Sequence, residues 1–210
     1  MSSHLEAVRR NILPLSKAHT LPGAFREWQF SGKTRDHEGS IATCELCEQE
    51  ELRYQFEITN SGTHRRLWVG SQCILKFGVA VYEGAARLTP TQTKKKLTSL
   101  MAQMRLESCL KALHRLADAE DNDILRNALQ YYKEHNHLTP KFAFVVLWRL
   151  AEHQIDHSPS FFKISLRRDK YQEDLRNMPS ARVHRIWPAL TISQRKLAVS
   201  LGHSPPAVMQ

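Results

Sequence analysis

The sequence predicts an α+β fold, in which a small β-hairpin module is followed by an all-α helical bundle. Over residues 52–58, apolar side chains alternate with polar ones, which is the period-two pattern of a half-buried strand. From residue 89 onward, apolar residues recur at helical spacing behind clear helix-start signals. We therefore expect an α/β region over residues 1–88 and a helical bundle over residues 89–210.

A cysteine pattern marks the hairpin module, which we place at about residues 41–78. Cys44 and Cys47 form a Cys-x-x-Cys pair, and Cys73 follows the hairpin at the start of a short helix that Ser71 would cap. A cysteine knuckle, a hairpin and a cysteine at a helix N-terminus together are typical of a treble-clef-like zinc module. The helix dipole and a nearby metal ion both favour the thiolate, which is the form that binds metal.

A structural zinc ion takes four ligands, and this pattern supplies three. His64, in the predicted turn, or His37, upstream of the knuckle, would complete a site of three cysteines and one histidine. We favour His64, because the turn can fold back over the metal. The alternative interpretation is that the cysteines are simply small buried side chains, but a third cysteine after a hairpin favours a metal. No strand–helix–strand unit surrounds the pair, which disfavours a thioredoxin-like redox motif.

Several short stretches around the cysteines carry a resemblance to known proteins: Cys44-Glu45-Leu46-Cys47, Arg53-Tyr54, Ile58-Thr59-Asn60 and Leu67-Trp68-Val69-Gly70-Ser71-Gln72-Cys73-Ile74. Together they resemble a zinc module of little-characterised phage, plasmid and integrative-element proteins. A small basic chain with an N-terminal zinc module and a helical C-terminal half is also similar in architecture to the Cas8-like subunit of type IV CRISPR effectors. The resemblance implies a subunit that contacts DNA within a mobile-element complex.

The positive charge of the chain is unevenly distributed along the sequence. Residues 1–89 carry 11 lysines and arginines against 10 acidic residues, whereas residues 90–210 carry 19 against 11. Such an excess in one half favours a surface that binds a polyanion, although solvated helix faces are the plain alternative. No apolar run is long enough to span a membrane and no signal peptide is evident. Cysteines at ligand spacing suit a reducing compartment, so we expect a cytoplasmic protein.

Helix-start signals divide the second half of the chain. Thr89, Thr139 and Thr191 each precede a helix, and a proline or a capping box follows them. The predicted helical segments are residues 89–116, 121–134, 142–150 and 161–178. In the first half we expect a short helix within residues 1–19, with Leu5 on its apolar face, and loop and strand over residues 21–42.

Three groups of basic residues are candidates for binding nucleic acid. Lysine and arginine neutralise phosphates, and arginine also recognises guanine edges. Aromatic residues among them, namely Phe161, Phe162 and Trp187, are expected in the core instead. The candidates are Arg65 and Arg66 on the hairpin turn, Lys94, Lys95 and Lys96 at the start of the long helix, and Lys163, Arg167, Arg168, Lys170, Arg182, Arg185, Arg195 and Lys196 near the C-terminus.

The sequence as a whole predicts a non-enzymatic nucleic-acid-binding protein with a structural zinc ion. We expect DNA rather than RNA as the main partner, together with other protein subunits. Two alternatives stay open: a metal-dependent nuclease, which an open coordination position would favour, and an adaptor that binds or inhibits a host protein. The run His135-Asn136-His137 spells the name of a nuclease motif, but it lies at a helix end outside the cysteine module.

Overall fold

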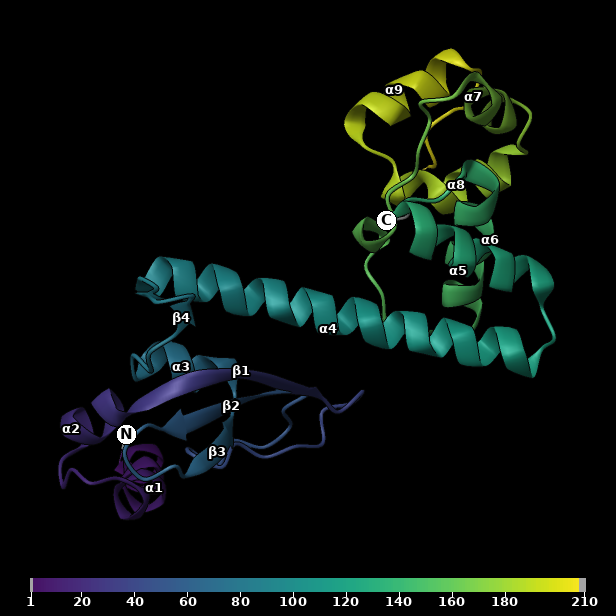
Figure 1. Ribbon diagram of the computed structural model, residues 1–210. Coiled ribbons are helices and arrows are strands. Elements are labelled where there is room, and N and C mark those ends of the chain that lie inside the picture. Colours follow the sequence, from purple (N-terminus) through teal and green to yellow (C-terminus); the bar gives the residue numbers. More distant parts are fainter. Residues whose placement is uncertain (1, 208–210) are drawn as a thin grey trace. The chain divides into compact units, whose positions relative to one another are not determined.

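The computed structural model describes residues 2–207 and has the predicted α+β architecture (Figure 1). The chain divides into two compact units, Met1–Met104 and Arg105–Gln210, and the division falls within the long helix α4 (Pro90–Ala119). The predicted boundary at residue 88 instead marks the start of this helix. The division lies further along because Leu97 and Met104 of α4 belong to the core of the first unit.

The first unit is built on an antiparallel sheet with the order β1-β2-β3. Its strands are β1 (Trp28–Asp36), β2 (Tyr54–Asn60) and β3 (Arg66–Val69). Phe56 pairs with Val69 and Ile58 with Leu67, so the apolar residues of β2 and β3 share one face of the sheet. The predicted hairpin is confirmed, and the side chain of Asn60 closes its turn by accepting from two backbone N–H groups.

Short helices complete the first unit and share one apolar core with the sheet. They are α1 (Ser2–Ile12), the 3-10 turn η1 (Leu13–Leu15), α2 (Leu21–Glu27) and α3 (Ser71–Lys76), with the small hairpin β4 (Tyr82–Glu83) and β5 (Ala86–Arg87) preceding α4. Two expectations were wrong. Leu5 of α1 is exposed, and α2 occupies residues expected to form loop and strand, where Thr20 caps a helix that has Pro22 in its first turn.

The second unit is helical. It contains α5 (Asp123–His135), α6 (Pro140–Glu152), α7 (Asp169–Arg176), α8 (Ser180–Ile186) and α9 (Ile192–Ser200), with the 3-10 turns η2 (Pro159–Phe161) and η3 (Trp187–Ala189). The predicted caps are confirmed, because Thr139 and Thr191 accept from the backbone N–H groups of Phe142 and Gln194. Phe162 and Trp187 lie in the core as expected. Among residues 2–207, no helix is both long and apolar enough to span a membrane.

The helical segment predicted over residues 161–178 is wrong in its first part. Helix α7 begins only at Asp169, and the preceding residues are extended. Leu138 holds this segment through two backbone hydrogen bonds, donating to Lys163 O at 2.8 Å and accepting from Ser165 N–H at 2.9 Å. The segment alternates buried Phe162, Ile164 and Leu166 with the less buried Lys163, Ser165 and Arg167. A period-two pattern of this kind favours an extended chain over a helix.

Candidate metal centre

Three buried thiols lie together in the first unit, as the cysteine pattern predicted. The Sγ atom of Cys73 lies 3.7 Å from that of Cys44 and 3.3 Å from that of Cys47. All three sulfur atoms are within 4.8 Å of one another. A zinc ion bound tetrahedrally at about 2.3 Å from each sulfur sets the sulfurs about 3.8 Å apart. The three thiols therefore fit the coordination of a single metal ion.

A tight turn positions the first two cysteines. Cys44 O accepts from Glu48 N–H at 2.9 Å, and Cys44 N–H donates to Gln49 O at 2.8 Å. Glu48 adopts a left-handed conformation, with φ of 63°. Its carboxylate binds Arg10 and Asn11 of α1, so this turn is attached to the first helix of the chain.

A second set of contacts attaches the turn to the sheet and to α3. Glu45 pairs with Trp68 of β3, since Glu45 N–H donates to Trp68 O at 2.9 Å and the Glu45 carboxylate accepts from Trp68 N–H at 2.7 Å. Strand β3 then runs through Gly70 into the first turn of α3, which carries Cys73. The three thiols thus join the knuckle, the hairpin and α3, as the treble-clef-like prediction requires.

Hydrogen bonds concentrate negative charge on one of the three sulfurs. Hydrogen bonding with Cys73, together with the backbone N–H groups of Cys47, Gly70 and Leu46, lowers the pKa of Cys44 to about 5. The same bond to Cys44, together with burial, raises the pKa of Cys73. Burial raises the pKa of Cys47. A thiolate held by backbone N–H groups beside two further thiols is suited to a cation.

The structure does not bring His64 to the thiols. His64 is exposed in the β2–β3 turn with φ of 57°, and its N–H donates to Asn60 O. This turn lies at one end of β3, whereas the thiols lie at the other end, beyond Val69. Because a strand advances about 3.3 Å per residue, the four residues of β3 separate the two ends.

His37 does not complete the cluster either. Its Nε2 atom lies 2.9 Å from Oε1 of Gln55, whose Nε2 donates to Thr43 O, next to Cys44. The histidine is therefore linked to the knuckle through Gln55 and does not contact the sulfurs. Within residues 2–207, no further histidine, cysteine, aspartate or glutamate joins the three thiols. A metal bound by the three thiols would take its fourth ligand from outside this set of side chains.

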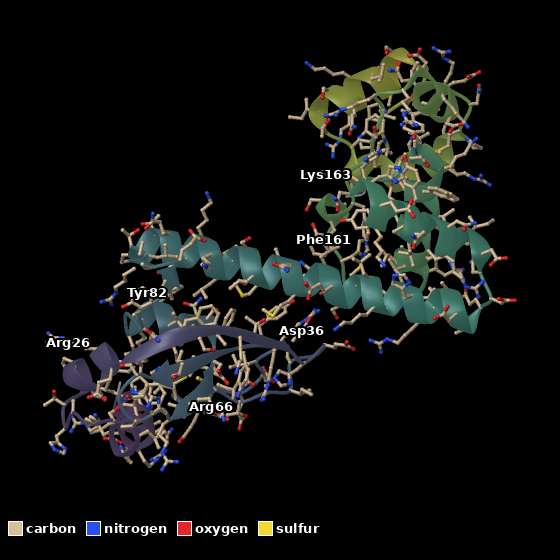
Figure 2. The ribbon with its side chains drawn as sticks, viewed as in Figure 1. Arg26, Asp36, Arg66, Tyr82, Phe161 and Lys163 are labelled. Carbon is tan, nitrogen blue, oxygen red and sulfur yellow. The ribbon has the colours of Figure 1, made fainter. Side chains whose placement is uncertain are left out.

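Several cations of the first unit gather on the polar face of the sheet. Arg66 (labelled in Figure 2) and Lys33 approach the buried carboxylate of Glu57 at 3.8 and 3.4 Å, and the guanidinium of Arg35 lies 3.7 Å above the Trp68 ring. Arg66 was among the predicted nucleic-acid contacts, whereas Lys33 and Arg35 were not. Their spacing of two residues, which puts both side chains on one face of a strand, was the available signal.

The lysine run at the start of α4 also belongs to the first unit rather than to the helical one. Lys94 and Lys95 are exposed, and Lys96 pairs with Glu83 at 3.3 Å. Arg65, in the hairpin turn, is exposed as well. These cations and the C-terminal basic residues therefore occupy separate units.

Eight candidate cations lie in the second unit, and no carboxylate of residues 2–207 forms an ion pair with any of them. Arg168 lies over the Tyr171 ring at 5.6 Å, and Arg195 donates to the carbonyl groups of Trp187 and Pro188. The eight residues are Lys163, Arg167, Arg168, Lys170, Arg182, Arg185, Arg195 and Lys196.

An aromatic pair with one exposed ring lies near these cations and was not among the predicted site residues. Trp148 is 39% exposed and stacks on Phe144, with ring centroids 6.0 Å apart. The guanidinium of Arg182 lies 4.9 Å from the centroid of the Phe144 ring. Phe144 and Trp148 are four residues apart, so both rings lie on one side of α6. The near-continuous apolar run of this helix gives no sign of which side is exposed.

Comparison with protein-family models, curated proteins and solved structures gives no match to this chain, so the resemblance in its cysteine module stays a prediction and its function has to be inferred from the thiol cluster and the cationic surfaces.

Proposed function

We propose that the protein binds nucleic acid without catalysing a reaction on it, with DNA as the favoured partner. The observation that supports this is the set of eight unpaired cations in the second unit. Acidic residues are not scarce there, because Arg105, Arg126 and Arg149 all pair with carboxylates. The eight cations therefore lack carboxylate partners in a unit where other arginines have them. Cations of this kind are suited to binding an external polyanion.

The exposed aromatic pair supports the same function. Proteins that bind single strands combine cations that follow the phosphates with aromatic rings on which bases stack. Trp148, Phe144 and Arg182 provide two stacked rings and a guanidinium on one surface. An unpaired base is a suitable ligand for Trp148, which stays partly exposed.

We further propose that Cys44, Cys47 and Cys73 hold a structural zinc ion. The site consists of three cysteine sulfurs, and no oxygen ligand from the described residues joins them. Zinc binds such sulfur ligands, whereas magnesium and calcium prefer oxygen. The metal would lock the knuckle to α3, which fixes the hairpin that carries Arg65 and Arg66. Other subunits of a mobile-element complex would be the protein partners, and the cytoplasm the compartment.

A metal-dependent nuclease is the second candidate, and the count of three ligands favours it. Catalytic zinc sites commonly have three protein ligands and an open position. A hydrolytic site of this type also uses a carboxylate as general base. The two carboxylates of the knuckle are engaged elsewhere, Glu45 with Trp68 and Glu48 with Arg10. Metal-dependent cleavage that survives purification and disappears in Cys73→Ser would establish this alternative.

The decisive experiment measures binding to a 20-base-pair duplex and a 20-nucleotide strand over a series of salt concentrations. Arg167→Glu/Arg168→Glu and Arg182→Glu/Arg185→Glu should weaken binding to every sequence, and each lost phosphate contact should reduce the salt slope by about one. The matched control is Lys111→Glu/Lys133→Glu, which makes the same charge change on exposed residues of α4 and α5. Unchanged affinity in both test variants would favour the adaptor alternative.

The hairpin arginines provide a contrasting test. If Arg65 and Arg66 enter a groove, their replacement by alanine should remove sequence preference but keep most of the non-specific affinity. Binding to a randomised duplex pool, followed by sequencing of the bound fraction, measures this preference. A pool that is enriched identically by the variant and the wild type would show that the hairpin does not recognise bases.

A further inference from the structure

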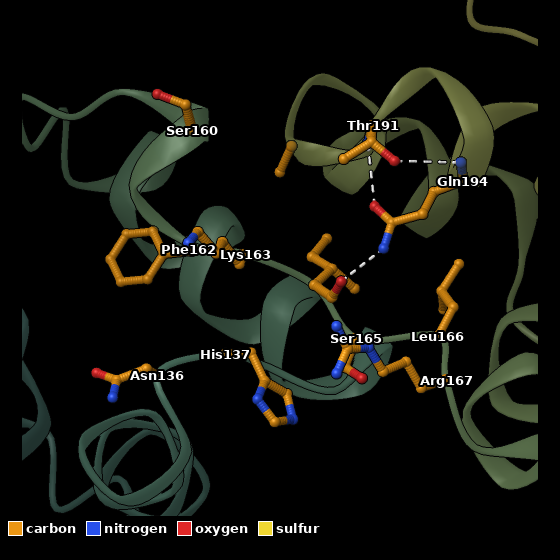
Figure 3. Close-up of a pocket in the computed structure, with 12 residues that line it drawn as sticks. Asn136, His137, Ser160, Phe162, Lys163, Ser165, Leu166, Arg167, Thr191 and Gln194 are labelled. Carbon is orange, nitrogen blue, oxygen red and sulfur yellow. Dashed lines mark hydrogen bonds between the residues drawn. The ribbon is translucent and has the colours of Figure 1, made fainter.

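A pocket of about 470 Å³ lies in the helical unit, between the end of α5, the extended segment before α7 and the start of α9 (Figure 3). Small-molecule pockets commonly measure about 300–1,000 Å³. Asn136 and His137 line one side, Thr191 and Gln194 another. None of the described lining residues is acidic.

The extended segment places three polar side chains of the pocket on one side of the chain. Because Phe162, Ile164 and Leu166 point into the core, the intervening residues Lys163, Ser165 and Arg167 point outward. All three line the pocket, and the apolar residues of the segment line it as well. No ion pair of Lys163 or Arg167, and no partner of the Ser165 hydroxyl, is found among residues 2–207. The pocket thus gathers two cations and a hydroxyl that are available to a ligand.

The backbone that carries these side chains is fixed on both sides. Leu138 pairs with the segment through Lys163 O and Ser165 N–H. On the other side, the Gln194 side chain donates to Ile164 O at 2.6 Å while its Oε1 atom accepts from Thr191 N–H (Figure 3). Binding at such a site has to order side chains only, because the backbone that carries them is already held.

His137 adds a polar wall with a defined orientation. Its Nδ1 lies 2.9 Å from the carbonyl oxygen of His135, which can only accept, so Nδ1 carries a proton. Its Nε2 lies 3.5 Å from the hydroxyl of Tyr131, which in turn contacts the hydroxyl of Tyr171 at 2.9 Å. The ring is therefore held in place in the lining of the same pocket.

We propose that this pocket binds the phosphomonoester of a nucleoside monophosphate, either free or at the end of a nucleic-acid strand. A terminal phosphate carries a charge of about −1.5 to −2 and three acceptor oxygens, which match Lys163, Arg167 and the Ser165 hydroxyl. An internal phosphodiester has a single negative charge and leaves one of the two cations unmatched. The proposal rests on the proposed function, since it assigns a nucleotide to one part of the basic region.

Calorimetry with adenosine monophosphate and with adenosine tests the pocket directly. The monophosphate should bind at least about tenfold more tightly than the nucleoside, because two charge-assisted contacts are gained. Lys163→Gln/Arg167→Gln should abolish this difference. The matched control Lys111→Gln/Arg176→Gln removes the same charge from exposed residues outside the pocket and should preserve it. Equal affinity for both ligands in the wild type would overturn the proposal.

A second measurement separates the two sources of the phosphate and guards against misfolding of a variant. Wild-type affinity is compared for one oligonucleotide with a 5′-phosphate, a 3′-phosphate or neither. A preference of about tenfold for one phosphorylated end identifies a strand terminus, whereas preference for the free monophosphate alone identifies a mononucleotide. Binding to all three oligonucleotides alike, without monophosphate binding, would overturn the pocket while sustaining the proposed function. No binding to the oligonucleotides or to the free monophosphate would remove both.

Discussion

Cys44 in the first unit and Cys109 in the second are both buried, yet their pKa values shift in opposite directions. In the first unit, Cys44 receives a thiol and backbone N–H groups, and its pKa falls to about 5. In the second unit, burial among apolar residues raises the pKa of Cys109 to about 12. Burial alone therefore does not indicate a metal ligand. What distinguishes the first unit is that its thiols converge from separate elements, where each receives polar contacts that a packed helix interior lacks.

Removal of a thiol should produce the largest difference between the units. Cys44→Ser, Cys47→Ser or Cys73→Ser should release the metal and unfold the first unit, because structural zinc binding contributes about 10–16 kcal/mol, as much as a whole domain's stability. The helical unit should keep its own unfolding transition. Elemental analysis and thermal denaturation followed by circular dichroism measure both effects.

Cys109→Ser is the matched control for this comparison. It puts a hydroxyl in the helical core and should lower the stability of the second unit by about 1–2 kcal/mol without loss of metal. A wild-type protein that purifies under reducing conditions without stoichiometric metal, and melts identically with a chelator, would contradict the metal centre.

Ion pairing provides the next contrast, this time within the second unit. The side chain of Arg149 is 11% exposed and pairs with Glu120 and Glu152. Arg149→Met should lower the stability of this unit by about 2–3 kcal/mol, since it removes the arginine partner of both carboxylates and leaves only His153 beside them. Lys170→Met, at an exposed unpaired cation, should change stability by less than about 0.5 kcal/mol. Urea denaturation compares the two; equal losses would show that the pairing makes no difference.

The smallest expected effect concerns a carboxylate of the first unit. The Asn60 side chain and the backbone N–H groups of Lys17 and Ala18 hold the pKa of Glu27 below its usual range. Because the folded pKa is lower than the unfolded one, this stabilisation is complete above the unfolded pKa of about 4.3 and is lost as the pH falls through the folded pKa. Glu27→Gln should therefore lower the melting temperature at neutral pH, and its difference from the wild type should shrink on acidification.

Local signals made part of the fold predictable. Alternation in β2 and the threonine caps depend on neighbouring residues, so the sequence revealed the hairpin and most helices. The extended segment before α7 was missed, although Phe162, Ile164 and Leu166 alternate there. Among the site residues, the three thiols follow from their spacing. The spacing does not show that His64 is excluded from the site, because that depends on which end of β3 lies near the knuckle.

Other features depend on tertiary contacts that no local pattern encodes. The exposure of Trp148 is set by which side of α6 the neighbouring helices cover. The pairing of cations depends on where distant carboxylates lie, as for Arg105 and Asp156. The charge imbalance between residues 1–89 and 90–210 does not coincide with the two units, since the lysine run of α4 belongs to the first unit.

The shared helix α4 determines where the chain can be cut into fragments. A fragment that ended at residue 88 would lack Leu97 and Met104, and the hydrophobic surface that these residues cover in the first core would be exposed and prone to aggregate. A fragment that began after residue 119 would in turn lose Cys109, Leu113 and Ala117 from the second core. Only a cut near residue 104 leaves each half with the part of the helix that its own core requires.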